Sequence, residues 1–75
     1  MTARHAVILV DSTSHALRIE KLLAQHDLAC KLVPVPRHLS SDCGVCVRID
    51  QKDIKPAREL LVAHGVVFQA IEDSL

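Results

Sequence analysis

The order of six segments constrains this 75-residue chain more than any other feature. Four short stretches rich in β-branched and aliphatic residues alternate with two amphipathic stretches, whose apolar residues recur at three- and four-residue spacing. The signals therefore run β-α-β-β-α-β, which is the split unit of ferredoxin-like domains. The predicted segments are 5–10 (strand), 15–26 (helix), 29–35 (strand), 44–49 (strand), 54–64 (helix) and 66–71 (strand).

This order predicts a single α+β domain over residues 1–75, with a four-stranded antiparallel sheet and both helices on one face. Pro34 places the second strand at an edge of the sheet, because proline has no N–H to donate to a ladder. In the third strand, Val45 and Val47 alternate with Cys46. We therefore expect Cys46 on the face that the helices leave open.

Capping residues mark the ends of both helices. The polar cluster 11–14 is suited to the start of the first helix. Asp53 is expected to cap the second helix, because this choice leaves Pro56 in the first turn, where a missing N–H costs little. Gly65 follows the second helix and is expected to adopt the left-handed conformation that ends many helices.

Composition excludes several classes of function. Phe68 is the only aromatic residue apart from the histidines, so the chain has no surface for stacking bases. Nine lysine and arginine residues balance nine aspartate and glutamate residues, so there is no basic stripe for a phosphate backbone either. We therefore expect no nucleic-acid partner.

The chain also lacks the signals of export. No apolar run approaches the roughly 18 residues of a membrane span, and residues 1–5 lead into the first strand without a signal-peptide core. We expect a cytoplasmic protein without a membrane partner, in a compartment where thiols stay reduced. Three cysteines, an odd number, do not indicate a disulfide framework.

The topology predicts which distant residues meet. The second strand runs parallel to the first, so the loop Arg37–Cys43 lies at the end of the sheet where the first helix begins, near His15. The second helix is expected to finish at the same end, which would bring His64 there. His5 and His26 are expected at the opposite end.

The loop carries the candidate reactive group, Cys43. An ordinary thiol has a pKa near ~8.5, so only about 3% is ionised at pH 7. A helix N-terminus and cations lower that value, and Arg37, His38 and His15 are the candidate cations. Gly44 leaves the backbone beside the sulfur open to a partner. Cys43 is therefore the predicted nucleophile.

The spacing Cys43-x-x-Cys46 leaves other interpretations open. It suits a thiol–disulfide pair or half of a zinc site, but no second such pair follows. If the third strand already includes Cys43, the two thiols point to opposite faces and cannot bond. Cys46 then serves as a small apolar residue, and Cys30 is expected to be a buried structural cysteine. We predict no metal site and no cofactor.

The loop resembles a known family. The run Pro-x-Pro-Arg…Ser-Ser-x-Cys-Gly within residues 33–48, with residues 16–23 upstream, is similar to the putative Se/S carrier protein-like family of small bacterial domains. The resemblance implies that Cys43 carries sulfur or selenium. We expect Ser40 and Ser41 to hydrogen-bond the outer atom, and Cys46 to resolve the adduct by attack.

Three functions follow as hypotheses. The first is a carrier, rather than an independent enzyme, that takes a persulfide or selenide from a donor protein and gives it to an acceptor protein. The second is a thiol–disulfide redox module that uses Cys43 and Cys46. The third is a non-catalytic metal-binding or protein-interaction domain. The first strand is apolar on both faces, so the open side of the sheet is expected to support a homodimer or contact with a partner protein.

Overall fold

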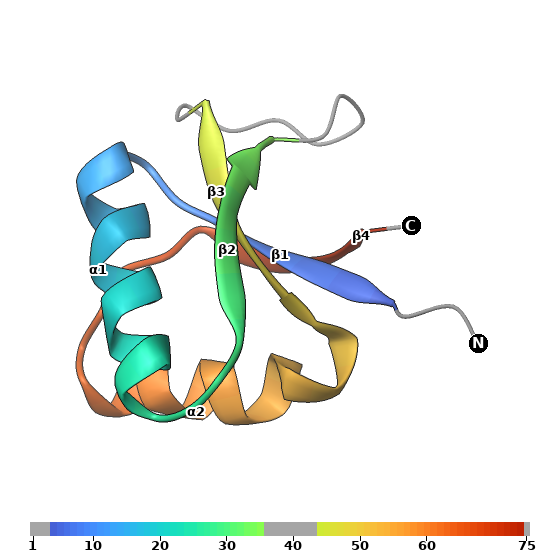
Figure 1. The fold of residues 1–75 in the computed structure, drawn as a ribbon. Helices are drawn as coiled ribbons and strands as arrows, with labels where there is room; N and C mark the ends of the chain where they lie inside the picture. The colour runs from blue at the N-terminus through green and yellow to red at the C-terminus, as the bar shows by residue number, and fades with distance from the viewer. Residues whose placement is uncertain (1–3, 36–43, 75) are drawn as a thin grey trace.

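The computed structural model describes residues 4–35 and 44–74 and has the predicted α+β architecture (Figure 1). Both helices lie on one side of a four-stranded antiparallel sheet, which confirms the ferredoxin-like arrangement. A 3₁₀ turn, Gln51–Asp53, leads into the second helix. The elements are β1 (His5–Leu9), α1 (Thr13–Gln25), β2 (Cys30–Pro34), β3 (Val45–Asp50), α2 (Ile54–Ala63) and β4 (Ala70–Ser74).

The strand order is β2-β3-β1-β4, so β2 lies at an edge as its proline predicts. Beyond the last paired residues of β2 and β3, the N–H of Val35 donates to the carbonyl oxygen of Gly44 at 3.2 Å. Hydrogen-bonded and non-hydrogen-bonded pairs alternate in an antiparallel ladder. Pro34, opposite Val45, therefore occupies a non-hydrogen-bonded pair, where its missing N–H costs the ladder nothing.

The main core fills the space between the sheet and the helices. Val47 and Ile49 of β3 face this core, whereas Cys46 faces the other side of the sheet, as the alternation predicts. Phe68 is the only phenyl ring in the chain and is only partly buried, so branched aliphatic side chains supply nearly all of the buried volume. The main core consists of Ala6, Ile8, Val10, Ala16, Ile19, Leu22, Leu23, Val47, Ile49, Ala57, Leu61 and Val66.

The open face of the sheet is divided into a charged part and an apolar part. The strand registers place three charged residues in one row across it: Lys31, Arg48 and Glu72, with Val7 between the last two. The next row, nearer the β2–β3 connection, is apolar: Val33, Cys46, Leu9 and Ala70.

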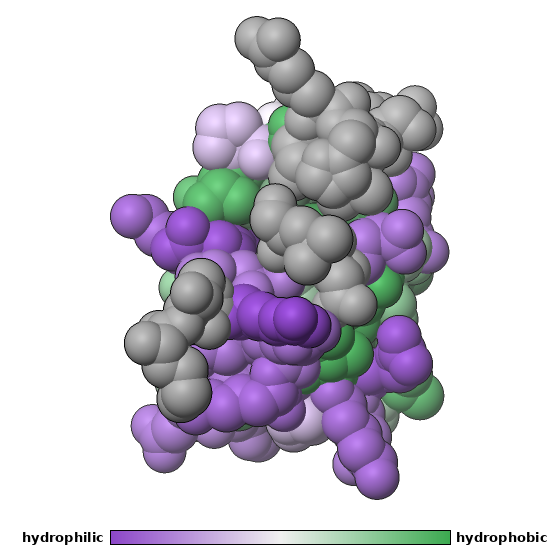
Figure 2. Space-filling model, turned by 90° about the vertical axis from the view of Figure 1, so that its right-hand side faces the viewer, coloured by the Kyte–Doolittle hydropathy of each residue, from purple (hydrophilic) through white to green (hydrophobic). Residues whose placement is uncertain are grey.

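The apolar side chains of this face are largely covered. Val7, Leu9 and Cys46 are buried, and Val33, Val35 and Ala70 are half-buried. Hydrophilic side chains occupy most of the lower half of the side shown in Figure 2, and hydrophobic ones form smaller areas. Among the described residues, the large hydrophobic side chains that are more than half exposed are Leu17, Val62 and Val67, none of which lies in a strand.

Both helices end in the same hydrogen-bond pattern. After α2, Gly65 has a φ of 64°, and the N–H of Val66 donates to the carbonyl oxygen of Leu61 at 2.9 Å. After α1, Asp27 has a φ of 61°, and the N–H of Leu28 donates to Leu23 at 2.9 Å. These are Schellman ends, and they confirm the prediction for Gly65.

The second helix starts at Ile54 as predicted, whereas α1 starts at Thr13, two residues before the predicted start, with its N-cap in the predicted polar cluster 11–14. The side chain of Ser12 caps α1 by accepting a hydrogen bond from the N–H of His15 at 3.4 Å. Asp53 occupies the N-cap position of α2, but its side chain makes no capping hydrogen bond. The 3₁₀ turn before α2 supplies the local hydrogen bonding instead, since the N–H of Ile54 bonds to the carbonyl oxygen of Gln51.

The two helix ends give opposite mutational predictions. Gly65→Ala is expected to lower the free energy of unfolding by about 1–2 kcal/mol, because a side chain strains left-handed backbone. Asp27→Gly is expected to raise it by about 0.5–1 kcal/mol by removing such strain. Urea titration followed by far-UV circular dichroism measures both. Equal signs for the two changes would contradict this account.

The path between α2 and β4 differs from the prediction in two ways. β4 begins at Ala70, not at residue 66, and His64 does not lie at the end of the sheet where α1 begins. The rings of His64 and His26 have centroids 5.8 Å apart, so α2 ends beside the C-terminal end of α1.

The cause is the direction of α2, which crosses beneath α1 rather than running alongside it (Figure 1). The sequence predicts that the second helix runs back to the end of the sheet where α1 begins. Residues 66–69 cover that distance instead, as a connection between α2 and β4. Val66 is buried in the main core, and the backbone N–H of Gln69 donates to the carbonyl oxygen of Leu9 at 2.7 Å. The side chain of Gln69 also donates to Asp11.

Candidate functional site

The candidate site is centred on the connection between β2 and β3, residues 36–43. The predicted site residues in this segment lie outside the described part of the chain, so their placement stays a prediction: Arg37, His38, Ser40, Ser41 and Cys43. The structure does describe the base of the connection, at Val35 and Gly44, and two further predicted residues, Cys46 and His15.

Gly44 is exposed and its backbone does not need to be glycine. Of the two glycines, Gly65 has a positive φ and Gly44 does not. A Cβ atom built at Gly44 has no described heavy atom within 4 Å, apart from its chain neighbours. Neither the backbone conformation nor crowding among the described residues therefore explains a glycine at this position. The expectation that it leaves room for a partner molecule remains compatible with this geometry.

Cys46 lies on the open face of β3 and is 0% exposed. It packs with Val7 and Leu9, and its Sγ donates to the carbonyl oxygen of Pro34 at 3.9 Å. This matches the interpretation of Cys46 as a small apolar residue. A thiol in this position reacts with an external reagent only after the neighbouring strands separate.

His15 occupies the first turn of α1 and is half-buried. Among the described residues, its buried Nδ1 atom has no hydrogen-bond partner. Leu22 lies two helical turns after His15 on the same side of α1, and it lines a pocket together with His64. Leu17 and Glu20 lie on the other side of α1, where they line a groove with Cys30 of β2. His15 thus lies on the flank of α1 away from β2, and its predicted action on Cys43 stays a prediction.

Cys30, at the start of β2, is half-buried rather than fully buried as predicted. Its Sγ donates to the backbone carbonyl oxygen of Glu20 at 3.5 Å. Burial raises the pKa of the Cys30 thiol, and the negative charge of Glu20 raises it further. Both effects favour the protonated thiol, so Cys30 is a poor nucleophile at neutral pH.

The histidines do not assemble a metal centre in the described part of the chain. His26 and His64 meet edge to face, and His5 lies 3.9 Å from a carboxylate oxygen of Asp50. Within residues 4–35 and 44–74, however, no three histidine, cysteine or acidic side chains gather closely enough to hold a metal ion. In the same residues, no helix is long and apolar enough to cross a membrane.

The fold and the loop define a small ferredoxin-like domain whose candidate chemistry rests on a cysteine in the β2–β3 connection. A family model described as "Putative Se/S carrier protein-like" matches residues 5–72, so the chain belongs to that family. No curated protein and no solved structure matches this chain.

Proposed function

We propose that this protein carries sulfur or selenium as a persulfide or selenide on Cys43. Membership of the Se/S carrier family over residues 5–72 is the observation that carries this proposal. The two other cysteines support the choice of Cys43. Cys46 is buried, and Cys30 has a raised pKa.

The transfer step needs no external oxidant, because the donor already holds the outer sulfur in an S–S bond, or the outer selenium in an S–Se bond that exchanges in the same way. The Cys43 thiolate attacks the terminal sulfur of a donor protein's persulfide, and a new S–S bond forms as the donor's S–S bond breaks. The electron pair of the broken bond leaves on the donor thiolate. The thiol proton of Cys43 passes to solvent before the attack, and an acceptor enzyme later removes the outer sulfur by the same kind of exchange.

The loop residues have proposed roles in this step. Arg37 and His38 stabilise the Cys43 thiolate, and Ser40 and Ser41 hydrogen-bond the outer sulfur or selenium. Gly44 lets the donor's chain approach the sulfur closely. The proposed partners are donor and acceptor proteins of the cytoplasm. A contact with a second copy is proposed through the half-buried Val33, Val35 and Ala70 of the open sheet face.

Mass spectrometry after incubation with a cysteine desulfurase and cysteine tests the assignment. The wild-type protein is expected to gain one sulfur atom, Cys43→Ser to gain none, and Cys30→Ser to gain one as the wild type does. If Cys43→Ser gains the same adduct as the wild type, the assignment to Cys43 is wrong.

Gly44→Ala tests whether Gly44 gives the donor protein access to Cys43 without contributing to the stability of the fold. The added methyl group meets no described atom within 4 Å, so the free energy of unfolding is expected to change by less than about 0.5 kcal/mol. The rate of sulfur loading is nevertheless expected to fall, because the methyl group lies where the donor approaches. A rate equal to that of the wild type would remove the proposed role of Gly44.

A redox pair of Cys43 and Cys46 is the alternative. Because Cys46 is buried against Val7 and Leu9, this function requires the base of the β2–β3 hairpin to open. Counting thiols after mild oxidation tests it. Loss of two of the three wild-type thiols within one monomer supports the pair, provided that Cys46→Ser keeps both of its remaining thiols, Cys30 and Cys43.

A further inference from the structure

A second surface, remote in sequence from the cysteine loop, has the features of a small ligand site. The pocket has a volume of about 210 Å³ and lies between the outer flank of α1 and the C-terminal end of α2. It is lined by Arg18, Lys21, Leu22, Gln25, His64 and Val66.

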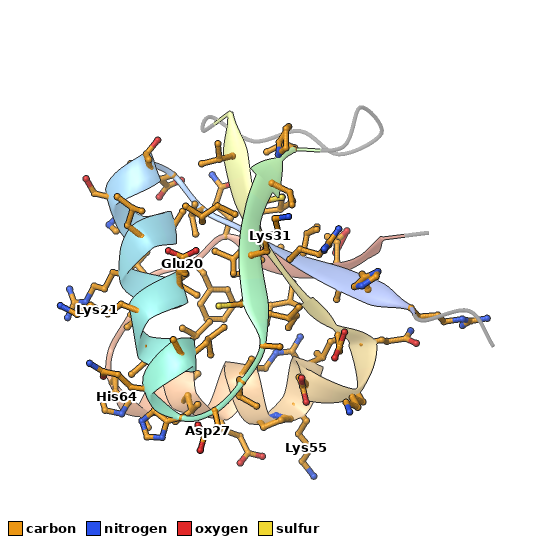
Figure 3. The ribbon with its side chains drawn as sticks, in the orientation of Figure 1. Glu20, Lys21, Asp27, Lys31, Lys55 and His64 are labelled. Carbon is orange, nitrogen blue, oxygen red and sulfur yellow. The ribbon has the colours of Figure 1, made fainter. Side chains whose placement is uncertain are left out.

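The apolar residues form the floor of this pocket and the polar ones its walls. Leu22 is 9% exposed and Val66 is 7% exposed, and both belong to the main core. Arg18, Lys21 and Gln25 share one flank of α1 at positions i, i+3 and i+7, and their side chains are exposed. Figure 3 shows Lys21 on the outer side of α1 and His64 below it, at the end of α2.

The charge of the pocket is positive and uncompensated. Arg18 and Lys21 are cations at neutral pH, and no carboxylate lines the pocket. In the described part of the chain, neither cation has a carboxylate oxygen within 4.0 Å. Two like charges at this spacing destabilise a helix slightly, so an anion between them would relieve repulsion as well as add attraction.

The remaining side chains add hydrogen-bond donors. Gln25 provides an amide NH₂, and the imidazole of His64 provides an N–H. His64 also contacts the ring of His26 edge to face, with centroids 5.8 Å apart, and this contact limits the orientations of His64 beside the pocket. A guanidinium, an ammonium, an amide and an imidazole together match a ligand that has several acceptor oxygens.

We propose that this pocket binds a small oxyanion of the size of phosphate or a carboxylate group. The volume is below the ~300–1,000 Å³ of pockets for drug-sized molecules, which favours a single small group over a larger metabolite. Because the walls are exposed to solvent, the affinity is expected to be in the millimolar range. The site is independent of the proposed carrier function, and either can fail without the other.

Heteronuclear NMR titration of the full-length protein with sodium phosphate tests the proposal. Phosphate is expected to shift the signals of Arg18, Lys21, Gln25 and His64 saturably, and sodium chloride at matched ionic strength is not. The double variant Arg18→Gln/Lys21→Gln is expected to bind phosphate at least tenfold more weakly. Circular dichroism checks that this variant keeps its helices.

A matched control pair lies on the other helix. Lys55 and Arg58 of α2 have the same three-residue spacing and are exposed, but they line no pocket with His64. Lys55→Gln/Arg58→Gln is therefore expected to bind phosphate as the wild type does. The proposal is overturned if sodium chloride gives the same shifts, if the Arg18/Lys21 variant keeps wild-type affinity, or if both double variants weaken binding equally.

The source of the oxyanion is resolved by a second titration with sodium acetate. Saturable shifts from phosphate indicate a free inorganic or phosphorylated ligand. Shifts from acetate without shifts from phosphate indicate the carboxylate of an acidic side chain. Either result supports an oxyanion site, and the absence of saturable shifts from both salts overturns it.

Discussion

Leu23→Ala is expected to lower the free energy of unfolding by about 2–5 kcal/mol. Leu23 is fully buried in the main core between α1 and the sheet, where alanine would leave a cavity. The stability of a domain of this size is roughly 4–11 kcal/mol, so this single change removes a large fraction of it. The lower end of this range is expected if the neighbouring Ile19 and Leu61 relax into the space, and the upper end if they stay in place.

The matched control for this change is on the same helix. Leu17 is 51% exposed, so Leu17→Ala loses little buried area and is expected to change the stability by less than about 0.5 kcal/mol. Urea titration followed by far-UV circular dichroism measures both variants. A loss below about 1 kcal/mol for Leu23→Ala would mean that the aliphatic core is loosely packed.

The second large effect is on the reactivity of the cysteines. In the native protein at pH 7, alkylation of Cys46 is expected to be at least about a hundredfold slower than in urea, because its sulfur is reached only when the sheet opens. Cys30 is expected to react slowly at pH 7 and faster as the pH passes its raised pKa. Cys43 is expected to react fastest near neutral pH. Mass spectrometry of each cysteine peptide against pH measures all three rates.

The raised pKa of Cys30 also fixes the sign of a stability effect. The folded state holds the Cys30 proton more tightly than the unfolded chain does. The protonated thiol therefore adds to the free energy of unfolding below the ordinary thiol pKa, and this addition is lost as the pH rises through the raised pKa. The difference in stability between the wild type and Cys30→Ala is therefore expected to shrink with rising alkaline pH. A difference that grows instead would place the Cys30 pKa below its ordinary value.

The fold could be predicted from the sequence because local signals agreed with the global arrangement. The order of strand and helix signals determined the sheet, and Pro34 identified its edge strand. The alternation of Val47 and Cys46 correctly assigned the two faces of β3. Gly65 marked the end of α2, since a positive φ is what that residue type permits most readily.

The direction of α2 could not be predicted, because periodicity reports which face of a helix is buried but not the angle at which the helix crosses its neighbour. The errors at His64 and at the start of β4 both follow from that angle. Cys30 is partly exposed because β2 is an edge strand with a groove beside it. Pro34 identified that edge, so the sequence did contain the signal against full burial of Cys30. The pocket at Arg18 and His64 forms only because α2 ends there.

The hydrogen bond between Val35 and Gly44 has a consequence for how this domain can vary. It joins the two residues that flank the eight-residue segment 36–43. Lengthening a closed loop costs little, about 0.6 kcal/mol for each doubling. Insertion of a few residues between Val35 and Gly44 is therefore expected to cost the sheet little stability.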